Sequence, residues 1–234
     1  MTNNTHSNIR DIMTETYPEN ETGGIMICGI NYGKSKKDEE RAASGGQAEE
    51  RYSSFFSDQG RSPKAANNYR FRNRLLTWFI HCWGIKLETR RGHDGAFERS
   101  FFQTNWLDTQ SHDAKGISHE VLVDGADGFL KLLEQREPSV IMFFGSGLIE
   151  ALNDPRIRDR VINILGKWSG KTDGCTVDKF GRKTQIKFEM KTQKFGETDI
   201  IGLPHPQRWG LSNEYVKRLK PPDLEKILKY NKPA

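Results

Sequence analysis

Three short motifs carry polar side chains at the end of an apolar run or directly after it, and two of them also contain glycine or proline. They are GINYGK at 29–34, TNW at 104–106 and LPHPQRW at 203–209. Gly29 and Gly33 allow a sharp turn and a close approach of the backbone to a ligand. Prolines on both sides of His205 restrict where its imidazole points. Asn31, Asn105 and His205 are hydrogen-bonding groups, so we predict recognition of a polar ligand at these positions.

Each motif also has an ordinary structural explanation. The glycine turn is neither a P-loop nor a complete GxGxxG motif, so it also fits a plain connection between a strand and a helix. The loop around His205 fits a structural turn, and Asn105 fits a residue that caps a strand end. The functional interpretation therefore depends on the fold bringing the motifs together.

Four apolar runs predict strands that are buried on both faces of a parallel sheet. They span residues 24–30, 100–107, 139–144 and 198–203. Helical spacing of apolar residues occurs at 68–83, 126–136, 148–152, 155–165, 212–219 and 222–230. This alternation predicts an α/β fold with right-handed crossovers. Because ligands bind beyond the carboxyl ends of parallel strands, the three motifs should meet at one edge of the sheet.

Two polar stretches interrupt the alternation. Residues 34–67 are rich in Lys, Glu, Ser, Gly and Gln, which predicts a long loop. Residues 169–197 contain a segment of period two, TQIKFEM at 184–190, which predicts a β-hairpin insertion. We interpret residues 1–234 as a single domain that carries these two insertions.

The charge of the chain is concentrated in two segments. The formal net charge is +5, and residues 34–74 and 167–234 contribute +4 and +7, while the other segments are negative. If the fold joins the two positive segments, they form a basic face able to follow phosphates. Aromatic residues suited to base stacking lie among these charges, at Tyr52, Phe55, Phe56, Tyr69, Phe71 and Trp209. The alternative is that the lysines only solvate the surface.

Composition excludes several classes of protein. The three cysteines, Cys28, Cys82 and Cys175, are too few and too far apart for a zinc ribbon or a four-cysteine iron–sulfur cluster. No apolar run reaches the roughly 18 residues of a membrane helix, and the polar N-terminus lacks a signal-peptide pattern. We expect a cytoplasmic protein without a metal or cofactor.

The joint order of the motifs resembles the uracil-DNA glycosylase superfamily. GINYG is similar to the GINPG and GMNPG motifs of some of its branches, and HPQRW is similar to HPS followed by a wedge loop. The third predicted strand ends in glycine and leads into a helix with Ala151-Leu152, as in the family. The resemblance covers about residues 24–217, although the specific matches are confined to these motifs.

The resemblance implies a three-layer α/β/α sandwich around a central, mainly parallel, four-stranded sheet. It also implies hydrolysis of the N-glycosidic bond of a pyrimidine that is flipped out of DNA. Asn31 would orient the water, because an amide is a poor proton acceptor. His205 would donate a hydrogen bond to the base carbonyl as negative charge develops there. Asn105 would read the edge of the base.

Further residues follow from the same resemblance. Gly29, Ile30, Tyr32 and Gly33 would line the base pocket, and Phe55 or Phe56 would stack on the base. Trp209 would fill the gap left by the flipped base. Lys34, Gln207 and Arg208 would contact DNA, either single-stranded or double-stranded with one base flipped. We expect the protein to act as a monomer.

Departures from the family pattern point to a roomier pocket. Tyr32 replaces the usual proline, and Gly33 stands where strict uracil enzymes have a tyrosine that excludes groups at C5 of the pyrimidine. We therefore expect a C5-modified cytosine, for example hydroxymethylated or glucosylated, as the target, with uracil or a mismatched base as the alternative. The superfamily includes phage-defence enzymes that remove bulky modified cytosines, which fits such a role.

Two other functions remain open. The first is a nucleic-acid-binding module without catalysis, which the change from proline to Tyr32 favours. The second is an enzyme that binds a nucleotide or phosphate at the Gly29–Gly33 turn. Steep salt dependence of DNA binding without base release would indicate the first. Tight binding of a free nucleotide without affinity for DNA would indicate the second.

Overall fold

The structure is a computed structural model of the 234-residue chain. It describes residues 22–33, 40, 43–44, 70–85, 101–111, 116–145, 147–178, 187–206, 208 and 210–221. Most of the predicted loop 34–67 and the predicted helix 222–230 lie outside these residues. The statements below concern the described residues.

A six-stranded mixed sheet runs through the centre of the protein, in the order β3-β1-β5-β8-β7-β6. The four predicted parallel strands are present as β1 (Ile25–Gly29), β3 (Phe101–Asn105), β5 (Val140–Phe144) and β8 (Thr198–Leu203). They are neighbours in the sheet and run parallel to one another. The predicted α/β class is therefore confirmed.

The predicted hairpin belongs to the same sheet. It consists of β6 (Asp173–Asp178) and β7 (Lys187–Phe195), which are antiparallel to each other. β7 also pairs antiparallel with β8. The expectation of a four-stranded sheet with a hairpin insertion is corrected, because the two hairpin strands extend the parallel strands into one sheet of six. The physical reason is that β8 would otherwise expose an edge of unpaired backbone groups, which β7 satisfies.

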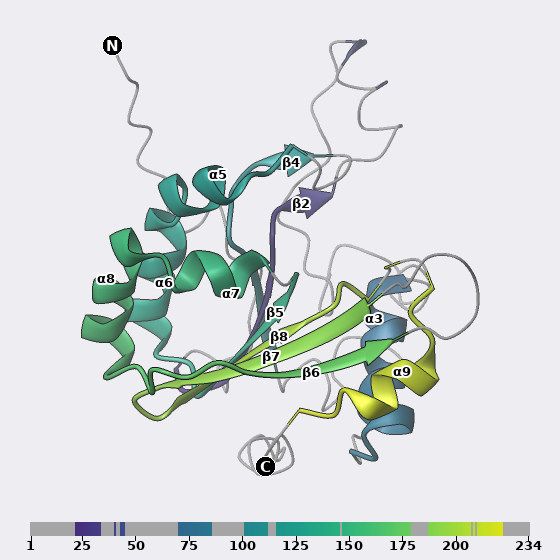
Figure 1. Cartoon of the computed structure of the whole chain (residues 1–234). Helices are drawn as coiled ribbons and strands as arrows, with labels where there is room; N and C mark the ends of the chain where they lie inside the picture. The colour runs from purple at the N-terminus through teal and green to yellow at the C-terminus, as the bar shows by residue number, and fades with distance from the viewer. Residues whose placement is uncertain are drawn as a thin grey trace.

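Helices pack on both faces of the sheet, as Figure 1 shows. One face is covered by α5 (His119–Asp124), α6 (Asp127–Arg136), α7 (Gly147–Leu152) and α8 (Pro155–Leu165). The other face is covered by α3 (Arg70–Leu76), the π-helix η3 (Thr77–Cys82) and α9 (Asn213–Arg218). Met26 and Cys28 of β1 face the first group, whereas Ile25 and Ile27 face the second. Both faces of the parallel strands are therefore buried, as continuous apolar runs predict.

The helix predicted at 68–83 is not a uniform α-helix. It is α-helical up to Leu76 and continues as the π-helix η3, where the N–H of Trp83 donates to the carbonyl of Trp78 at 2.9 Å. The wider turn leaves both Trp78 and Phe79 fully buried. A π-helical turn departs from the period of 3.6 residues on which the prediction relied.

Two further elements were not predicted. Tyr32–Gly33, which belongs to the first motif, forms the short strand β2, and it pairs in parallel with β4 (Gln110–Ser111). Figure 1 shows this pair beyond the end of β1. The short helix α5 is the second, and the hydroxyl of Ser118 accepts a hydrogen bond from the N–H of Val121 at its start, as an N-cap does.

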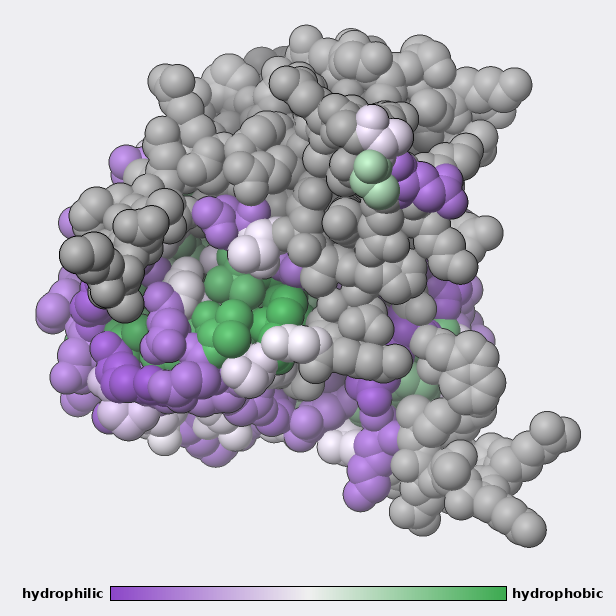
Figure 2. Space-filling view, turned by 90° about the horizontal axis from the view of Figure 1, so that it is seen from above, coloured by the Kyte–Doolittle hydropathy of each residue, from purple (hydrophilic) through white to green (hydrophobic). Residues whose placement is uncertain are grey.

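Seen from above, the surface has a small hydrophobic area among hydrophilic residues (Figure 2). Val121 is the large hydrophobic side chain that is exposed among the described residues. None of the helices within these residues is long and apolar enough to cross a membrane.

Candidate functional site

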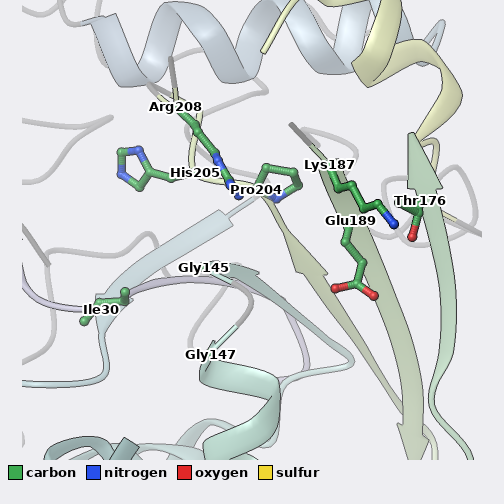
Figure 3. Close-up of a pocket in the computed structure, with 9 residues that line it drawn as sticks. All are labelled: Ile30, Gly145, Gly147, Thr176, Lys187, Glu189, Pro204, His205 and Arg208. Carbon is green, nitrogen blue, oxygen red and sulfur yellow. The ribbon is translucent and has the colours of Figure 1, made fainter. Parts of the chain in front are cut away.

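A cavity of about 580 Å³ opens at the carboxyl ends of the parallel strands (Figure 3). Ile30, Gly145, Pro204 and His205, which directly follow β1, β5 and β8, form one part of its lining. Thr176, Lys187 and Glu189 of the hairpin form another part, and Gly147 and Arg208 complete it. The cavity therefore lies at the edge where the sequence predicted that the motifs would meet.

His205 projects from the loop after β8 and lies against an aromatic ring. The centroids of its imidazole and of the Phe71 ring are 5.5 Å apart. His205 is exposed at the surface, yet nearby protein atoms partly desolvate its imidazole, and this desolvation lowers the pKa of His205. The neutral imidazole is therefore favoured at pH 7, and it keeps one N–H donor and one acceptor.

Arg74 of α3 holds the loop that carries His205. Its guanidinium donates hydrogen bonds to the carbonyls of Pro206 (3.4 Å) and Leu211, and to the side-chain oxygen of Asn213 (3.5 Å). Arg74 and Phe71 are three residues apart and so lie on the same side of α3. One side of α3 therefore contacts both the imidazole of His205 and the backbone that follows His205 in the chain. No local pattern in the sequence links Arg74 to a loop 132 residues away, so its role was not predicted.

Asn31 is half-buried and directly follows Ile30, whose side chain packs on Gly145. A Cβ atom at Gly145 would lie 3.1 Å from Cδ1 of Ile30, and the φ angle of Gly145 is +147°, so glycine suits this position on both counts. Ile30 lines the cavity, whereas Asn31 is not among the lining residues. Asn31 is therefore beside the cavity rather than in its wall.

Asn105 ends β3 and is 1% exposed. It is the register partner of Gly29, and a Cβ atom at Gly29 would lie 2.6 Å from Oδ1 of Asn105. Gly29 thus provides the space that the Asn105 side chain occupies, which is a different use of this glycine from the predicted approach to a ligand. The side-chain nitrogen of Asn105 is buried and has no hydrogen-bond partner among the residues that the structure describes. A buried donor without a partner is costly, and such groups often mark functional sites.

The remaining predicted residues are distributed unevenly. Arg208 lines the cavity, and its guanidinium lies 5.6 Å from the centre of the Phe188 ring. The backbone of Tyr32 and Gly33 forms β2. Lys34, Phe55, Phe56, Gln207 and Trp209 lie outside the described residues, so their predicted roles in stacking, wedging and DNA contact stay predictions.

The three cavity residues of the hairpin, Thr176, Lys187 and Glu189, were not predicted either. The period-two pattern indicated a hairpin but gave no sign that the hairpin would border the cavity. The pairing of β7 with β8 places these residues there.

The described part of the chain contains neither a metal-binding cluster nor a disulfide bond. There, no three His, Cys, Asp or Glu side chains are grouped so that they could hold a metal ion. Cys28, Cys82 and Cys175 are free thiols, and burial raises the pKa of Cys28 well above its usual value.

Neither the protein-family models nor the curated proteins with which the chain was compared match it. The functional interpretation therefore relies on the motifs and on the geometry of the cavity.

Proposed function

We propose that the protein is a monofunctional DNA glycosylase that hydrolyses the N-glycosidic bond of a flipped-out pyrimidine and leaves an abasic site. The main support is the position of His205 and Ile30-Asn31 at the ends of β8 and β1, on either side of β5, next to one cavity. The packing of helices on both faces of the sheet supports the three-layer α/β/α architecture that this family implies.

Asn31 and His205 have different roles in the proposed reaction. A water molecule oriented by Asn31 attacks C1′ of the deoxyribose, the bond between C1′ and the base nitrogen breaks, and the base leaves with the bonding electron pair. The proton that the water loses passes to the departing base directly or through solvent, so the products are the abasic sugar and the neutral base. The neutral imidazole of His205 donates a hydrogen bond to the base carbonyl as negative charge develops on it. The lowered pKa of His205 supports this role, because desolvation favours the neutral imidazole, which still carries one N–H donor.

The size of the cavity favours a pyrimidine larger than uracil. Pockets for drug-sized ligands measure roughly 300–1,000 Å³, and a pyrimidine base is much smaller than such ligands. The volume of about 580 Å³ and the two glycines in the lining leave space beyond the base. We therefore propose a C5-modified cytosine as the preferred target, with DNA bound by a monomer in the cytoplasm.

A panel of oligonucleotides tests this proposal. It contains uracil, a mismatched thymine, cytosine and C5-modified cytosines, in single and double strands, and alkali converts each abasic site into a strand break. We expect cleavage of at least one substrate by the wild-type protein and a decrease of about 100-fold or more for Asn31→Ala. Asn163→Ala, on the exposed side of α8, serves as the matched control and should keep its activity. If the folded wild-type protein produces no abasic site with any DNA, the proposal is wrong.

A nucleic-acid-binding module without catalysis is the second candidate. It is favoured by the absence of Asn31 from the cavity lining and by Tyr32 in place of the family's proline. Strong salt dependence of DNA binding, without release of any base, would select this function.

A further inference from the structure

Strand β7 changes its environment along its length. On the side that faces α7 and α8, Phe195 and Gln193 are buried, Lys191 and Glu189 are half-buried and Lys187 is exposed. Oε1 of Gln193 accepts a hydrogen bond from Nδ2 of Asn153 at 2.9 Å, and Lys191 forms an ion pair with Glu150 of α7. The half of β7 near Phe195 thus anchors the helices, whereas the half near Lys187 extends past them to the cavity.

Three polar side chains share this cavity-facing side of the hairpin. Thr176 and Glu189 are direct cross-strand partners, so their side chains lie on the same face of the sheet. Lys187 is two residues before Glu189, and side chains alternate along a strand, so it lies on that face as well. Figure 3 shows the three side chains on the hairpin, with Ile30 and His205 toward the opposite side of the cavity.

The three side chains offer complementary hydrogen-bonding groups. The hydroxyl of Thr176 donates and accepts, the ammonium of Lys187 donates, and the carboxylate of Glu189 accepts. The side chain of Glu189 is 42% exposed, and the contact of its Oε2 with Nζ of Lys191 is a long one, at 3.5 Å. Glu189 therefore retains acceptor capacity toward the cavity.

We propose that Thr176, Lys187 and Glu189 form a subsite for a hydroxyl-bearing substituent at C5 of the target base, such as a hydroxymethyl or a sugar group. This inference rests on the proposed function and adds the residues that select the substrate. With the base next to His205, its substituent extends across the cavity to the hairpin. Each hydroxyl of a sugar can both donate and accept a hydrogen bond, so neighbouring hydroxyls can bind the donors of Thr176 and Lys187 and the acceptor of Glu189.

A phosphate is the main alternative occupant, because Lys187 and Arg208 are both cationic. Glu189 argues against it, since a carboxylate in the same wall repels an anion and can accept hydrogen bonds only from donors. The polyol uses all three side chains, whereas the phosphate uses only the cation and the hydroxyl.

The first experiment compares matched oligonucleotides that carry cytosine, 5-hydroxymethylcytosine or its glucosylated form. We expect Glu189→Ala and Thr176→Val each to lower kcat/KM by about tenfold or more for the substrates with hydroxyl groups and by less than about threefold for the other. Lys194→Met is the control, because Lys194 lies on the same strand outside the cavity and contacts Glu197. Equal losses for all substrates, no loss for either variant, or a wild-type preference for unmodified cytosine would overturn the subsite.

The second experiment measures binding of the free nucleosides to the intact chain by calorimetry. The glucosylated nucleoside should bind the wild-type protein more tightly than deoxycytidine or glucose alone, and Glu189→Ala should remove this advantage. Binding without base release would retain the subsite and reject the glycosylase. Base release without such selectivity would retain the glycosylase and reject the subsite. Displacement of the nucleoside by inorganic phosphate would show an anion site and overturn the proposal.

Discussion

Two histidines lie in contrasting surroundings, one between α5 and α8 and the other at the cavity. His119, 47% exposed, contacts Asp154 through its Nε2 at 2.8 Å. Arg156 bridges Asp154 and Glu120 through several hydrogen bonds, which hold the pKa of Asp154 well below its usual range. Asp154 also accepts from the N–H of Arg156 at the start of α8. This cluster joins two helices, and its members serve as one another's partners.

The polar groups near the carboxyl ends of the parallel strands, of which His205 lines the cavity, are arranged differently. His205 rests against Phe71 with a lowered pKa, the amide nitrogen of Asn105 is buried without a partner, and Arg74 donates to the backbone of the loop after β8. Desolvation of the His205 imidazole and burial of the Asn105 amide nitrogen without a partner among the described residues each cost free energy. The contrast supports the proposal that the cluster around His119 is structural and that the residues around His205 serve the proposed binding and catalysis.

The largest expected difference between the two regions is in turnover. His205→Ala should lower base release by about 100- to 1,000-fold, because the developing charge on the base loses its donor. DNA affinity, measured by fluorescence anisotropy, should change far less. His119→Ala is the matched histidine control, and its turnover should stay near that of the wild type. Equal losses of binding and turnover in His205→Ala would remove His205 from the catalytic residues.

Asn105 tests whether its buried amide is retained for function. Under the proposed role of Asn105 in reading the base, Asn105→Leu should lower turnover by about tenfold or more, although the side chain is 1% exposed and does not line the cavity. Its free energy of unfolding should fall little or even rise by about 1 kcal/mol, since a buried donor without a partner is removed. Urea denaturation and base release, measured on the same preparation, check both parts. A large loss of stability would instead indicate that Asn105 is a packing residue.

Arg74 should have a smaller effect, because it acts through the loop. Arg74→Gln should lower kcat several-fold, with little change in KM, and alter the NMR signals of the His205 ring. Arg74→Lys should recover part of the loss, because an ammonium can still donate to one of the carbonyls. Arg160→Gln, on the α8 surface, is the control. Unchanged His205 signals in Arg74→Gln would contradict the positioning role.

The pKa of His205 predicts a modest dependence on pH. The pKa of His205 is lower in the folded protein than in the unfolded chain. As the pH falls through about 6.5, the unfolded chain therefore binds a proton at His205 before the folded protein does. His205 thus lowers the free energy of unfolding between about pH 6.5 and its pKa in the folded protein. Its neutral form, and with it base release, should persist below pH 6.5. NMR titration should place the pKa of His205 below the usual histidine value and show an increase in Phe71→Leu. A His205 pKa at or above the usual value would contradict the desolvation.

The smallest effect is expected for the cluster around His119. Glu120→Gln weakens a partly solvated ion pair with Arg156, and such pairs contribute little. The melting temperature should fall slightly, and base release should not change. A marked loss of base release in Glu120→Gln would contradict a purely structural role for the cluster around His119.

Local sequence patterns predict much of the fold. The apolar runs that become β1, β3, β5 and β8 are long enough to be buried on both faces. The predicted helices at 126–136 and 155–165 agree closely with the bounds of α6 and α8. The transition from α3 to η3 was not predictable, because the same apolar spacing fits both helix types over one turn.

The sequence by itself determined that Asn31, Asn105 and His205 stand at the carboxyl ends of three apolar runs. Because these runs become parallel strands, their carboxyl ends lie at one edge of the sheet. Only the tertiary structure decided how those side chains are held. Asn105 lies under Gly29 through strand register, Arg74 reaches Pro206 across 132 residues, and the hairpin adds Glu189 to the cavity by pairing with β8. Periodicity reports burial along one segment, whereas these contacts depend on which edges and faces meet in three dimensions.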